Sequence, residues 1–376
     1  MKKRKISILI NDLDTGGAER VVSILLNMLY KEYDITLFMM HNIIFYDIPK
    51  DIKIVIVGNS KLSDSGVVKL FKIPFIALEY KRLNKNRVSI SFLSRSNYIN
   101  ILAKLFGADI KVIAGERALP SLQYKKGFNG FINRLLIKYL YPKANLIFAN
   151  SKGNAIDLEK NFGIKNIQVI YNPFDIDKIA ELKSKKALLK RGFNFITVGR
   201  LDEGKNHQLL IRAMKRVDGN LYIIGDGILR EKLEHLIAEL NLERRVFLLG
   251  KQKNPYKYLA RADVFLFASN REGFPNVLVE ALACSLPIIS TDCQSGPREI
   301  LAPDSNITSQ LKDNIEIANY GILTPVGSIE KMVEAINILR ENKKLMLEYQ
   351  QKSLNRAKEF HKDKIIDDFI NIIENS

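Results

Sequence analysis

Two glutamates flank a Gly-Phe-Pro-Asn turn in the stretch REGFPNVLVEALACSLPIIST, with seven residues between them. Glu272 precedes the turn, and Glu280 falls on the first turns of the apolar helix that the turn opens. The N–H groups of Asn276, Val277 and Leu278 at the helix start are predicted to be free for an anion. Carboxylates accept hydrogen bonds from sugar hydroxyls, so the stretch favours a ligand with both phosphate and sugar. The alternative is that Glu280 only complements the positive helix end.

A second strand-to-helix turn, in VGRLDEGKNHQLL, carries two cations. Arg200 supplies a planar guanidinium and Lys205 a mobile ammonium, a pair suited to clamping a diphosphate. Taken alone, two cations in a loop are more often merely solvated. His207 has no partner at catalytic or metal-ligand spacing, so we expect it to be structural or exposed.

Two glycine turns complete the set of candidate ligand loops. Gly16 and Gly17 lie in NDLDTGGAER, where they allow a backbone to approach a ligand at a helix start. A plain tight turn explains them equally well, and the dinucleotide fingerprint Gly-x-Gly-x-x-Gly is absent. Gly225 and Gly227 surround Asp226 in IIGDGILRE, where a helix start capped near Asp226 is a sufficient explanation.

These loops must be held by strands that alternate with helices. Short runs rich in Val, Ile and Phe predict strands buried on both faces, which is typical of parallel sheets covered by helices. The runs are KISILI, DITLFMM, NLIFAN, IQVIYN, NFITVGR, NLYIIGD, RVFLLG, DVFLFAS and PIIST. Ligands of such sheets bind at the carboxyl ends of strands, where all of these loops fall.

The length of 376 residues predicts two domains. A proline and capping aspartates in YNPFDID (171–177) indicate the hinge, so we assign 1–171 and 172–354 to the two domains. The tail from about residue 328 reads as helical. No apolar run reaches the roughly 18 residues needed to span a bilayer, and the apolar run after the basic start is too short for a signal peptide. Two cysteines suit a reducing cytoplasm.

The net charge of +17 is one-sided: residues 1–171 hold 27 Lys and Arg against 13 Asp and Glu. Such asymmetry favours a polyanionic partner, such as anionic lipid, nucleic acid or a diphosphate-bearing substrate, over solubility alone. Cations alternate with apolar residues in 61–87 and 124–143, as in helices that lie in a lipid headgroup layer. Pro74 predicts that the first stretch forms two short helices. An ordinary core-packed helix with a wet basic face is the alternative. The membrane or acceptor candidates are Lys69, Lys72, Lys81 and Arg82.

Along the chain, the four motifs follow the order Gly-Gly-Ala-Glu-Arg, Val-Gly-Arg-Leu-x3-Lys-Asn, Gly-Asp-Gly and Glu-Gly-Phe-Pro-Asn-Val-Leu-x-Glu-Ala. Together they resemble the family 4 retaining glycosyltransferases of the GT-B fold. The resemblance covers nearly the whole chain, and Glu-Gly-Phe-Pro-Asn-Val-Leu-x-Glu-Ala is its most specific part. It implies an α/β protein of two Rossmann-like domains with parallel sheets facing a cleft. The N-terminal domain would receive the acceptor and the C-terminal domain a nucleotide sugar. A last helix, about 355–376, would pack back on the N-terminal domain.

The resemblance also assigns roles. Arg200 and Lys205 would neutralise the donor diphosphate, Glu280 would hold the ribose, and Glu272 would meet the donor sugar together with the backbone at 274–276. Pro275 can offer only its carbonyl. The full donor set is Gly16, Gly17, Arg200, Lys205, Glu272, Phe274, Pro275, Asn276, Val277, Leu278 and Glu280, with Arg200, Lys205 and Glu272 as the catalytic residues. Such enzymes usually need no metal, so neither a metal nor another cofactor is expected.

The acceptor half departs from the common pattern. Many relatives carry a histidine near the reacting sugar, whereas IAGERALPS places Glu116 and Arg117 in that region, so these two residues are also acceptor candidates. The segments SRSNYINILAKLFG and YLYPKANLIFANSKGN resemble bacterial transferases that add N-acetylgalactosamine from its UDP-sugar to a polyprenyl-diphosphate-linked saccharide for protein glycosylation. A peripheral enzyme on the cytoplasmic face of the inner membrane is then expected. Sister enzymes of O-antigen, capsule and lipopolysaccharide assembly share most motifs.

The alternative from a different class of protein is that the chain binds nucleic acid. Basic and aromatic residues do not interleave as in a recognised RNA or DNA motif, and phosphate-binding turns recur at several helix starts. The sequence therefore favours the enzyme.

Overall fold

A computed structural model describes residues 3–375, which form two compact units. The N-terminal unit contains the chain up to Pro173 together with the last helix, from Lys362 onward, and the C-terminal unit spans Phe174–His361. The chain therefore passes between the units twice, and each unit is described by itself.

The N-terminal unit has, among its described residues, a seven-stranded parallel sheet in the order β3-β2-β1-β4-β5-β6-β7. The strands are β1 (Arg4–Ile10), β2 (Tyr33–Met39), β3 (Lys53–Ile56), β4 (Val88–Phe92), β5 (Lys111–Glu116), β6 (Leu146–Ala149) and β7 (Ile167–Val169). The helices are α1 (Gly17–Leu29), α2 (Gly66–Phe71), α3 (Ile73–Leu83), α4 (Ser94–Leu105), α5 (Pro120–Gln123), α6 (Gly127–Leu140), α7 (Lys152–Phe162) and α16 (Lys362–Glu374), with a 3₁₀ turn at Tyr141–Lys143.

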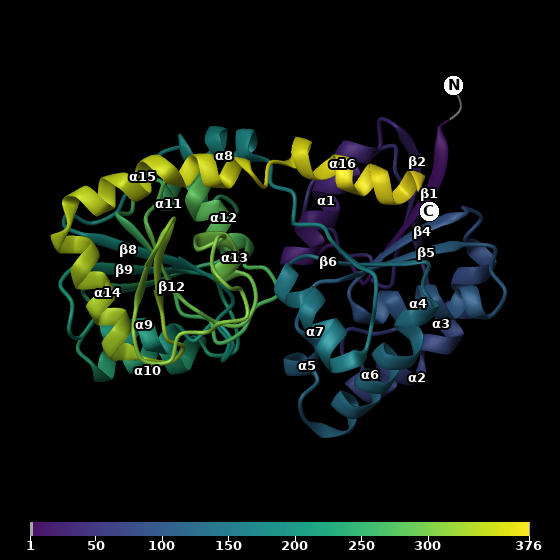
Figure 1. The fold of residues 1–376 in the computed structure, drawn as a ribbon, viewed down its shortest axis with the longest axis horizontal. Helices are drawn as coiled ribbons and strands as arrows, with labels where there is room; N and C mark the ends of the chain where they lie inside the picture. Colours follow the sequence, from purple (N-terminus) through teal and green to yellow (C-terminus); the bar gives the residue numbers. More distant parts are fainter. Residues whose placement is uncertain (1–2, 376) are drawn as a thin grey trace. The chain divides into compact units, whose positions relative to one another are not determined.

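Helices cover both faces of this sheet (Figure 1), and β1 shows why. Its side chains alternate, so Ile6, Ile8 and Ile10 enter the core formed with α1 and α16, while Leu9 enters the core formed with α3, α4 and α6. The last helix contributes Phe369 to the first of these cores. It is therefore an integral part of the N-terminal unit, and it begins at Lys362, later than the expected start near 355.

The C-terminal unit has, over its described residues, a seven-stranded sheet in the order β10-β9-β8-β11-β12-β14-β13. Its strands are β8 (Asn194–Val198), β9 (Asn220–Ile224), β10 (Val246–Gly250), β11 (Val264–Phe267), β12 (Ile288–Thr291), β13 (Glu316–Ala318) and β14 (Gly321–Thr324). Its helices are α8 (Ile176–Lys183), α9 (His207–Ala213), α10 (Arg230–Glu239), α11 (Tyr256–Leu259), α12 (Asn276–Ala283), α13 (Pro297–Leu301), α14 (Ile329–Glu341) and α15 (Lys343–Lys358).

The prediction of parallel α/β sheets is confirmed, with one difference at a sheet edge. Strand β13 pairs antiparallel with β14. A parallel neighbour needs a long crossover, whereas Ala318 and Gly321 are joined by a short turn that only an antiparallel pair permits. All nine strands predicted from apolar runs are present, and the predicted helical tail forms α14, α15 and α16.

The break at Pro74 is also confirmed. Helix α2 ends at Phe71 and α3 begins at Ile73, with Pro74 in the first turn of α3. Proline is tolerated there because the first N–H groups of a helix have no partner within the helix. Over residues 3–375, no helix has the length and apolar character that crossing a bilayer requires.

Candidate active site

In the C-terminal unit, the loop after β8 and the loop after β11 are bonded to each other. The N–H of Asn270 donates to Gly204 O at 2.8 Å, and the amide Nδ2 of Asn270 donates to Glu203 O at 2.9 Å. Within the first loop, Asp202 Oδ1 accepts from the N–H groups of Gly204 and Lys205. Each loop therefore fixes the backbone of the other.

This arrangement brings Lys205 and Glu272 together. Lys205 Nζ lies 2.5 Å from Glu272 Oε1, in a pair that is only partly exposed, and it lies 5.8 Å from the centroid of the Phe267 ring. Arg200, by contrast, is exposed on the same loop. The site thus holds one cation in a fixed ion pair and leaves the other with room to move.

Glu280 lies on α12 and is 2 % exposed. Burial, with a smaller contribution from Glu280, raises the pKa of the neighbouring Cys284 to about 12. Glu280 therefore lies on the buried face of α12, as its small apolar neighbours predict.

The start of α12 differs from expectation at one position. Leu278 N–H donates to Pro275 O at 3.0 Å, so the expectation of a free N–H at Leu278 is wrong. A proline at the N-cap closes the first turn tightly, and this turn uses the only hydrogen-bonding group of the Pro275 backbone. Anion binding by the N–H groups of Asn276 and Val277 stays a prediction.

A buried ion pair that the sequence analysis missed supports this turn. Arg298 on α13 donates from Nη2 to Asp292 Oδ2 at 2.6 Å, from Nε to Asp292 Oδ1 at 3.1 Å and from Nη1 to Glu316 Oε2 at 2.8 Å. Between the paired residues, Ser295 and Gly296 have φ values of 67° and 89°. The pair therefore clamps a left-handed turn between its two members.

That turn packs directly on the glutamate-flanked loop. Ser295 Oγ donates to Gly273 O at 2.6 Å, and a Cβ on Gly296 would lie 2.2 Å from Pro275 Cδ. Only glycine fits so close to Pro275 at a positive φ. The sequence signal was Ser-Gly-Pro between a strand and a helix, which predicts a tight turn opening the helix.

The other glycine turn and His207 have structural explanations. A Cβ on Gly225 would lie 1.9 Å from Gly199 O, so this glycine lets two loop backbones touch. The expected cap is wrong: α10 has Leu229 at its N-cap, and Asp226 instead accepts from the N–H of Gly227. His207 is 3 % exposed, and burial lowers its pKa to about 4, so it is a neutral core residue.

In the N-terminal unit, Gly16 is the N-cap of α1 and Gly17 its first residue. A Cβ on Gly16 would lie 2.0 Å from Glu19 Oε2, so the carboxylate of Glu19 folds back against the Gly-Gly turn. The missing side chain at Gly16 therefore serves a contact within the protein, whatever else the turn binds.

The carboxyl end of β4 in the same unit carries local strain. Leu93 has φ 75° and ψ 145°, a region that residues other than glycine rarely adopt, and such strain clusters at functional sites. Two residues later, Arg95 donates to Ser60 Oγ at 2.8 Å, and its Nε lacks a partner within residues 3–375. Burial and, to a smaller extent, Arg95 lower the pKa of His41. No motif in the sequence pointed to this cation.

Glu116 and Arg117 likewise lie at the carboxyl end of a strand, here β5. Glu116 is the last residue of the strand and is buried, and Arg117 begins the loop that leads to α5. Lys69, Lys72, Lys81 and Arg82 lie on or beside α2 and α3. Lys72 Nζ pairs with Asp64 at 2.8 Å and Lys81 Nζ donates to Phe106 O, whereas Arg82 is exposed.

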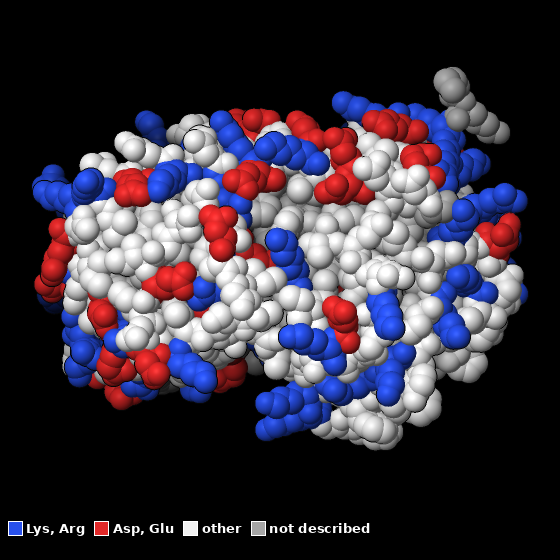
Figure 2. Space-filling view, viewed as in Figure 1, with Lys and Arg blue, Asp and Glu red and all other residues white. Residues whose placement is uncertain are grey.

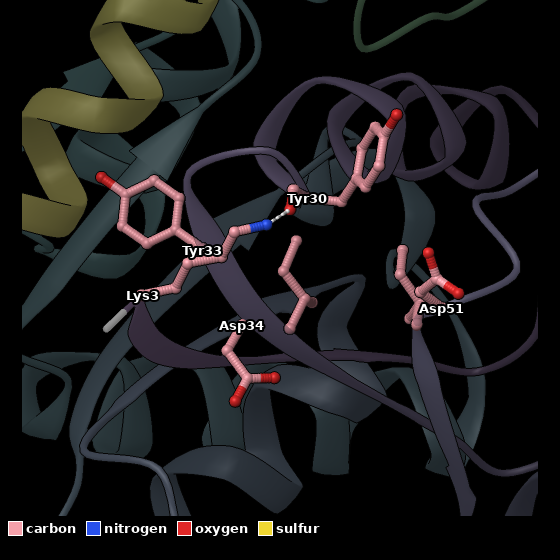
Figure 3. A pocket seen from close by; sticks show the side chains of 7 residues that line it. Lys3, Tyr30, Tyr33, Asp34 and Asp51 are labelled. Atoms are coloured by element: carbon pink, nitrogen blue, oxygen red, sulfur yellow. Dashed lines mark hydrogen bonds between the residues drawn. The ribbon is translucent and has the colours of Figure 1, made fainter. Parts of the chain in front are cut away.

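A hollow of about 400 Å³ lies elsewhere on the N-terminal unit (Figure 3). It is lined by Lys3, Tyr30, Tyr33, Asp34 and Asp51 with two isoleucines, and Lys3 Nζ donates to Tyr30 O across it. Lys3 and Asp51 precede β1 and β3, and Tyr33 and Asp34 are the first residues of β2, so the hollow lies at the amino ends of these strands. Ligands of parallel sheets bind at the opposite edge. Among the described residues, no group of three His, Cys, Asp or Glu is placed to hold a metal ion.

Comparisons with known proteins agree with this architecture. The family described as Glycosyltransferase Family 4 matches residues 15–178, and the family Glycosyl transferases group 1 matches residues 178–359. The chain belongs to the family 4 glycosyltransferases of the GT-B fold, and it is a hexosyltransferase.

Its relatives include two enzymes of Campylobacter jejuni. The chain is 42 % identical to N-acetylgalactosamine-N,N'-diacetylbacillosaminyl-diphospho-undecaprenol 4-alpha-N-acetylgalactosaminyltransferase, with 97 % of this chain and 98 % of the relative covered. It is 26 % identical to an alpha-1,4-N-acetyl-D-galactosaminyltransferase that extends a related undecaprenol-linked glycan, with 98 % of each chain covered.

Solved structures support the fold. Anabaena HepE in complex with UDP and glucose superposes with a TM-score of 0.79 at 18 % identity, covering 99 % of this chain and 100 % of that one. Sucrose-phosphate synthase from Thermosynechococcus elongatus gives a TM-score of 0.82 at 15 % identity, covering 99 % of each. At these identities the likeness concerns the fold alone.

Proposed function

We propose that this enzyme transfers N-acetylgalactosamine, with retention of configuration, from its UDP-sugar to a saccharide linked to undecaprenyl diphosphate, in an alpha-1,4 linkage. The observation that carries the proposal is the 42 % identity, over nearly the full length of both chains, to a Campylobacter jejuni transferase with this donor sugar and this kind of acceptor in its name. Metal independence is part of the proposal.

The Lys205–Glu272 pair supports a donor site in the C-terminal unit. In the proposed reaction, Arg200 and Lys205 neutralise the charge that grows on the leaving diphosphate. Glu272 then accepts from hydroxyls of the donor sugar, and Glu280 from those of the ribose. The leaving diphosphate itself takes the proton of the acceptor hydroxyl, so the protein need not supply a nucleophile. Gly17 offers its N–H to a phosphate.

The experiment is a transfer assay with a short undecaprenyl-diphosphate-linked saccharide and a panel of UDP-N-acetylgalactosamine, UDP-N-acetylglucosamine, UDP-galactose, UDP-glucose and GDP-mannose. Extension by one N-acetylhexosamine from the first donor, with the product cleaved by an α-N-acetylgalactosaminidase, is the expected result. Linkage analysis of the product tests the alpha-1,4 assignment. Transfer from GDP-mannose alone would contradict the proposed donor.

The second candidate is a transferase of O-antigen, capsule or lipopolysaccharide assembly with another UDP-hexose. It is favoured by 34 % identity to lipopolysaccharide 1,6-galactosyltransferase of Salmonella typhimurium, although only 40 % of this chain is covered. Exclusive transfer of galactose in the same panel would support this candidate.

We further propose that the N-terminal unit binds the anionic cytoplasmic face of the inner membrane. Helices α2, α3 and α6 expose phenylalanines beside cations, with Phe71 and Phe75 each 73 % exposed. The starts of α2 and α6 adjoin, since a Cβ on Gly66 would lie 2.5 Å from Asn129 Nδ2. Figure 2 shows Lys and Arg side chains gathered where Figure 1 places the α5–α6 connection. Exposed rings beside cations suit a lipid headgroup layer.

A further inference from the structure

Arg117 is a buried guanidinium that the protein only partly pairs. Its side chain is 8 % exposed, its Nη2 donates to Asn172 Oδ1 at 2.5 Å, and its Cζ lies 5.7 Å from the centroid of the Phe92 ring. Within residues 3–375, its Nε and Nη1 have no hydrogen-bond partner. An arginine has five N–H donors, so most of the hydrogen-bonding capacity of this side chain is unused.

Two other buried arginines in the chain have hydrogen-bond partners of the kind expected for a purely structural arginine. Arg298 bonds both oxygens of Asp292 and one of Glu316. Arg356 donates to Ile300 O at 2.9 Å and Glu299 O at 2.6 Å, and it pairs with Glu359. Arg117 differs from both, since its guanidinium is only partly paired. A buried cation without full pairing costs free energy. Consistently, burial lowers the pKa of Arg117 to about 10, although Glu19 and Glu116 partly offset this effect.

Glu116 does not serve as the missing partner, because its oxygens are already engaged. Tyr141 Oη donates to Oε2 at 2.6 Å and Ser94 Oγ at 3.2 Å, while the N–H groups of Arg117 and Ala118 donate to Oε1 at 2.9 and 3.3 Å. The Glu116 carboxylate therefore holds the backbone at Arg117 in place through hydrogen bonds.

Two asparagines hold the same backbone from the carbonyl side. Asn154 Nδ2 donates to Glu116 O, and Asn150 Nδ2 donates to Arg117 O, each at 3.4 Å. With Asn172 on the guanidinium, the cation is fixed at one point on the carboxyl edge of the sheet, between β4 and β6. Such fixing reduces the cost of ordering when a ligand binds.

We infer that Arg117 binds a phosphate group of a reactant through its unpaired N–H groups, with Glu116 and Asn172 as positioning residues. The guanidinium matches phosphate oxygens in shape and charge, and the carboxyl edge of a parallel sheet is where ligands bind. The inference rests on the proposed function for the identity of the reactants. Both the UDP-sugar and the lipid-linked acceptor carry a diphosphate, so either one can supply the phosphate.

The test compares Arg117→Gln and Arg117→Lys with two controls. Lys111→Gln removes an exposed cation of the same unit, and Arg298→Gln, which is the control for melting temperature alone, removes a buried arginine that is fully paired. Affinities for two soluble probes are measured by calorimetry: UDP stands for the donor, and geranyl diphosphate stands for the acceptor end. Melting temperatures without ligand are recorded for all four variants.

Arg117→Gln is expected to weaken one probe by about 10- to 100-fold, the range for a hydrogen bond to a charged group. Arg117→Lys should weaken it less, and Lys111→Gln not at all. Weakened UDP assigns the donor, and weakened geranyl diphosphate assigns the acceptor. The melting temperature of Arg117→Gln should equal or exceed that of the wild type, whereas Arg298→Gln should melt lower.

Affinities of Arg117→Gln within twofold of the wild type for both probes would overturn the inference, as would a wild-type protein that binds neither probe. Failure of the proposed function has a different signature. It would appear as missing transfer in the donor panel, which is read without any variant of Arg117.

Discussion

The ammonium of Lys205 lies 2.5 Å from the carboxylate of Glu272, although the two residues belong to loops after different strands. The pair connects the cation proposed to face a diphosphate with the carboxylate proposed to face a sugar. Lys205 would therefore interact both with a bound diphosphate and with Glu272. The ion pair would lie where the diphosphate and the sugar of a nucleotide sugar are joined.

We predict that Arg200→Ala and Lys205→Ala reduce turnover far more than stability. Each removes charge that stabilises the leaving diphosphate, and loss of one such group costs about 10²–10³ in kcat. Arg200 is exposed, so its replacement should leave the melting temperature unchanged. Lys205→Arg is the control that keeps the charge. Wild-type turnover in both alanine variants would refute the clamp.

Glu280→Ala should cripple donor use. Loss of a buried carboxylate that bonds the ribose is expected to cost about 1.5–3 kcal/mol of binding. The measurement is the affinity for UDP, with Glu239→Ala on the exposed face of α10 as the control. If Glu280→Ala binds UDP and turns over like the wild type, the ribose assignment is wrong.

Arg298→Gln should lower both stability and donor affinity. Breaking a buried ion pair leaves Asp292 without its counter-ion and costs about 3–5 kcal/mol. The Ser295–Gly296 turn would then loosen under Gly273 and Pro275, so the KM for the donor should rise even where the protein remains folded. Urea unfolding and initial rates provide the two readouts. Unchanged donor KM in a destabilised variant would show that the pair does not position the loop.

The burial of His207 leads us to predict that the free energy of unfolding decreases in mild acid. Its ordinary pKa of 6.5 falls to about 4 in the folded protein, because burial disfavours the charged ring. The unfolded chain therefore takes up a proton first, and stability falls as the pH drops from about 6.5 to about 4, by roughly 3 kcal/mol in total. Urea unfolding at pH 7 and pH 4.5 should show a smaller difference for His207→Phe than for the wild type. An equal difference would contradict the assignment.

Phe71→Ser combined with Phe75→Ser should impair membrane binding. Wild-type protein is expected to sediment with phosphatidylglycerol vesicles at low salt and to be released at high salt. The double variant should bind at least about tenfold more weakly, since each ring loses apolar burial. Leu188→Ser, at an exposed apolar position in the C-terminal unit, is the control. Salt-insensitive binding, or no binding to anionic vesicles, would refute the proposal.

The reversal of Lys81, Arg82, Lys85 and Arg87 to Glu tests the electrostatic part of the same proposal. Arg82 is exposed, whereas Lys81 also donates to Phe106 O and contributes to the fold. Melting temperatures must therefore accompany the sedimentation of this variant.

Much of the fold was predictable because its signals are local. Apolar runs such as NFITV and DVFLF specify strands buried on both faces, and Pro74 specifies a helix start. The Glu272–Glu280 spacing likewise identified a loop and a helix start from chain neighbours alone. The antiparallel strand β13 is too short and mixed in character to be recognised in this way.

The tertiary structure decided which side chains meet. Lys205 and Glu272 are 67 residues apart, and Arg117 and Asn172 are 55 apart, so no periodicity in the sequence predicts either contact. The sequence by itself determined the residue types, the strands and the loops at their carboxyl ends. Burial depends on every element packed around a residue, and so only the folded chain shows that Arg298 is fully paired while Arg117 keeps unpaired donors.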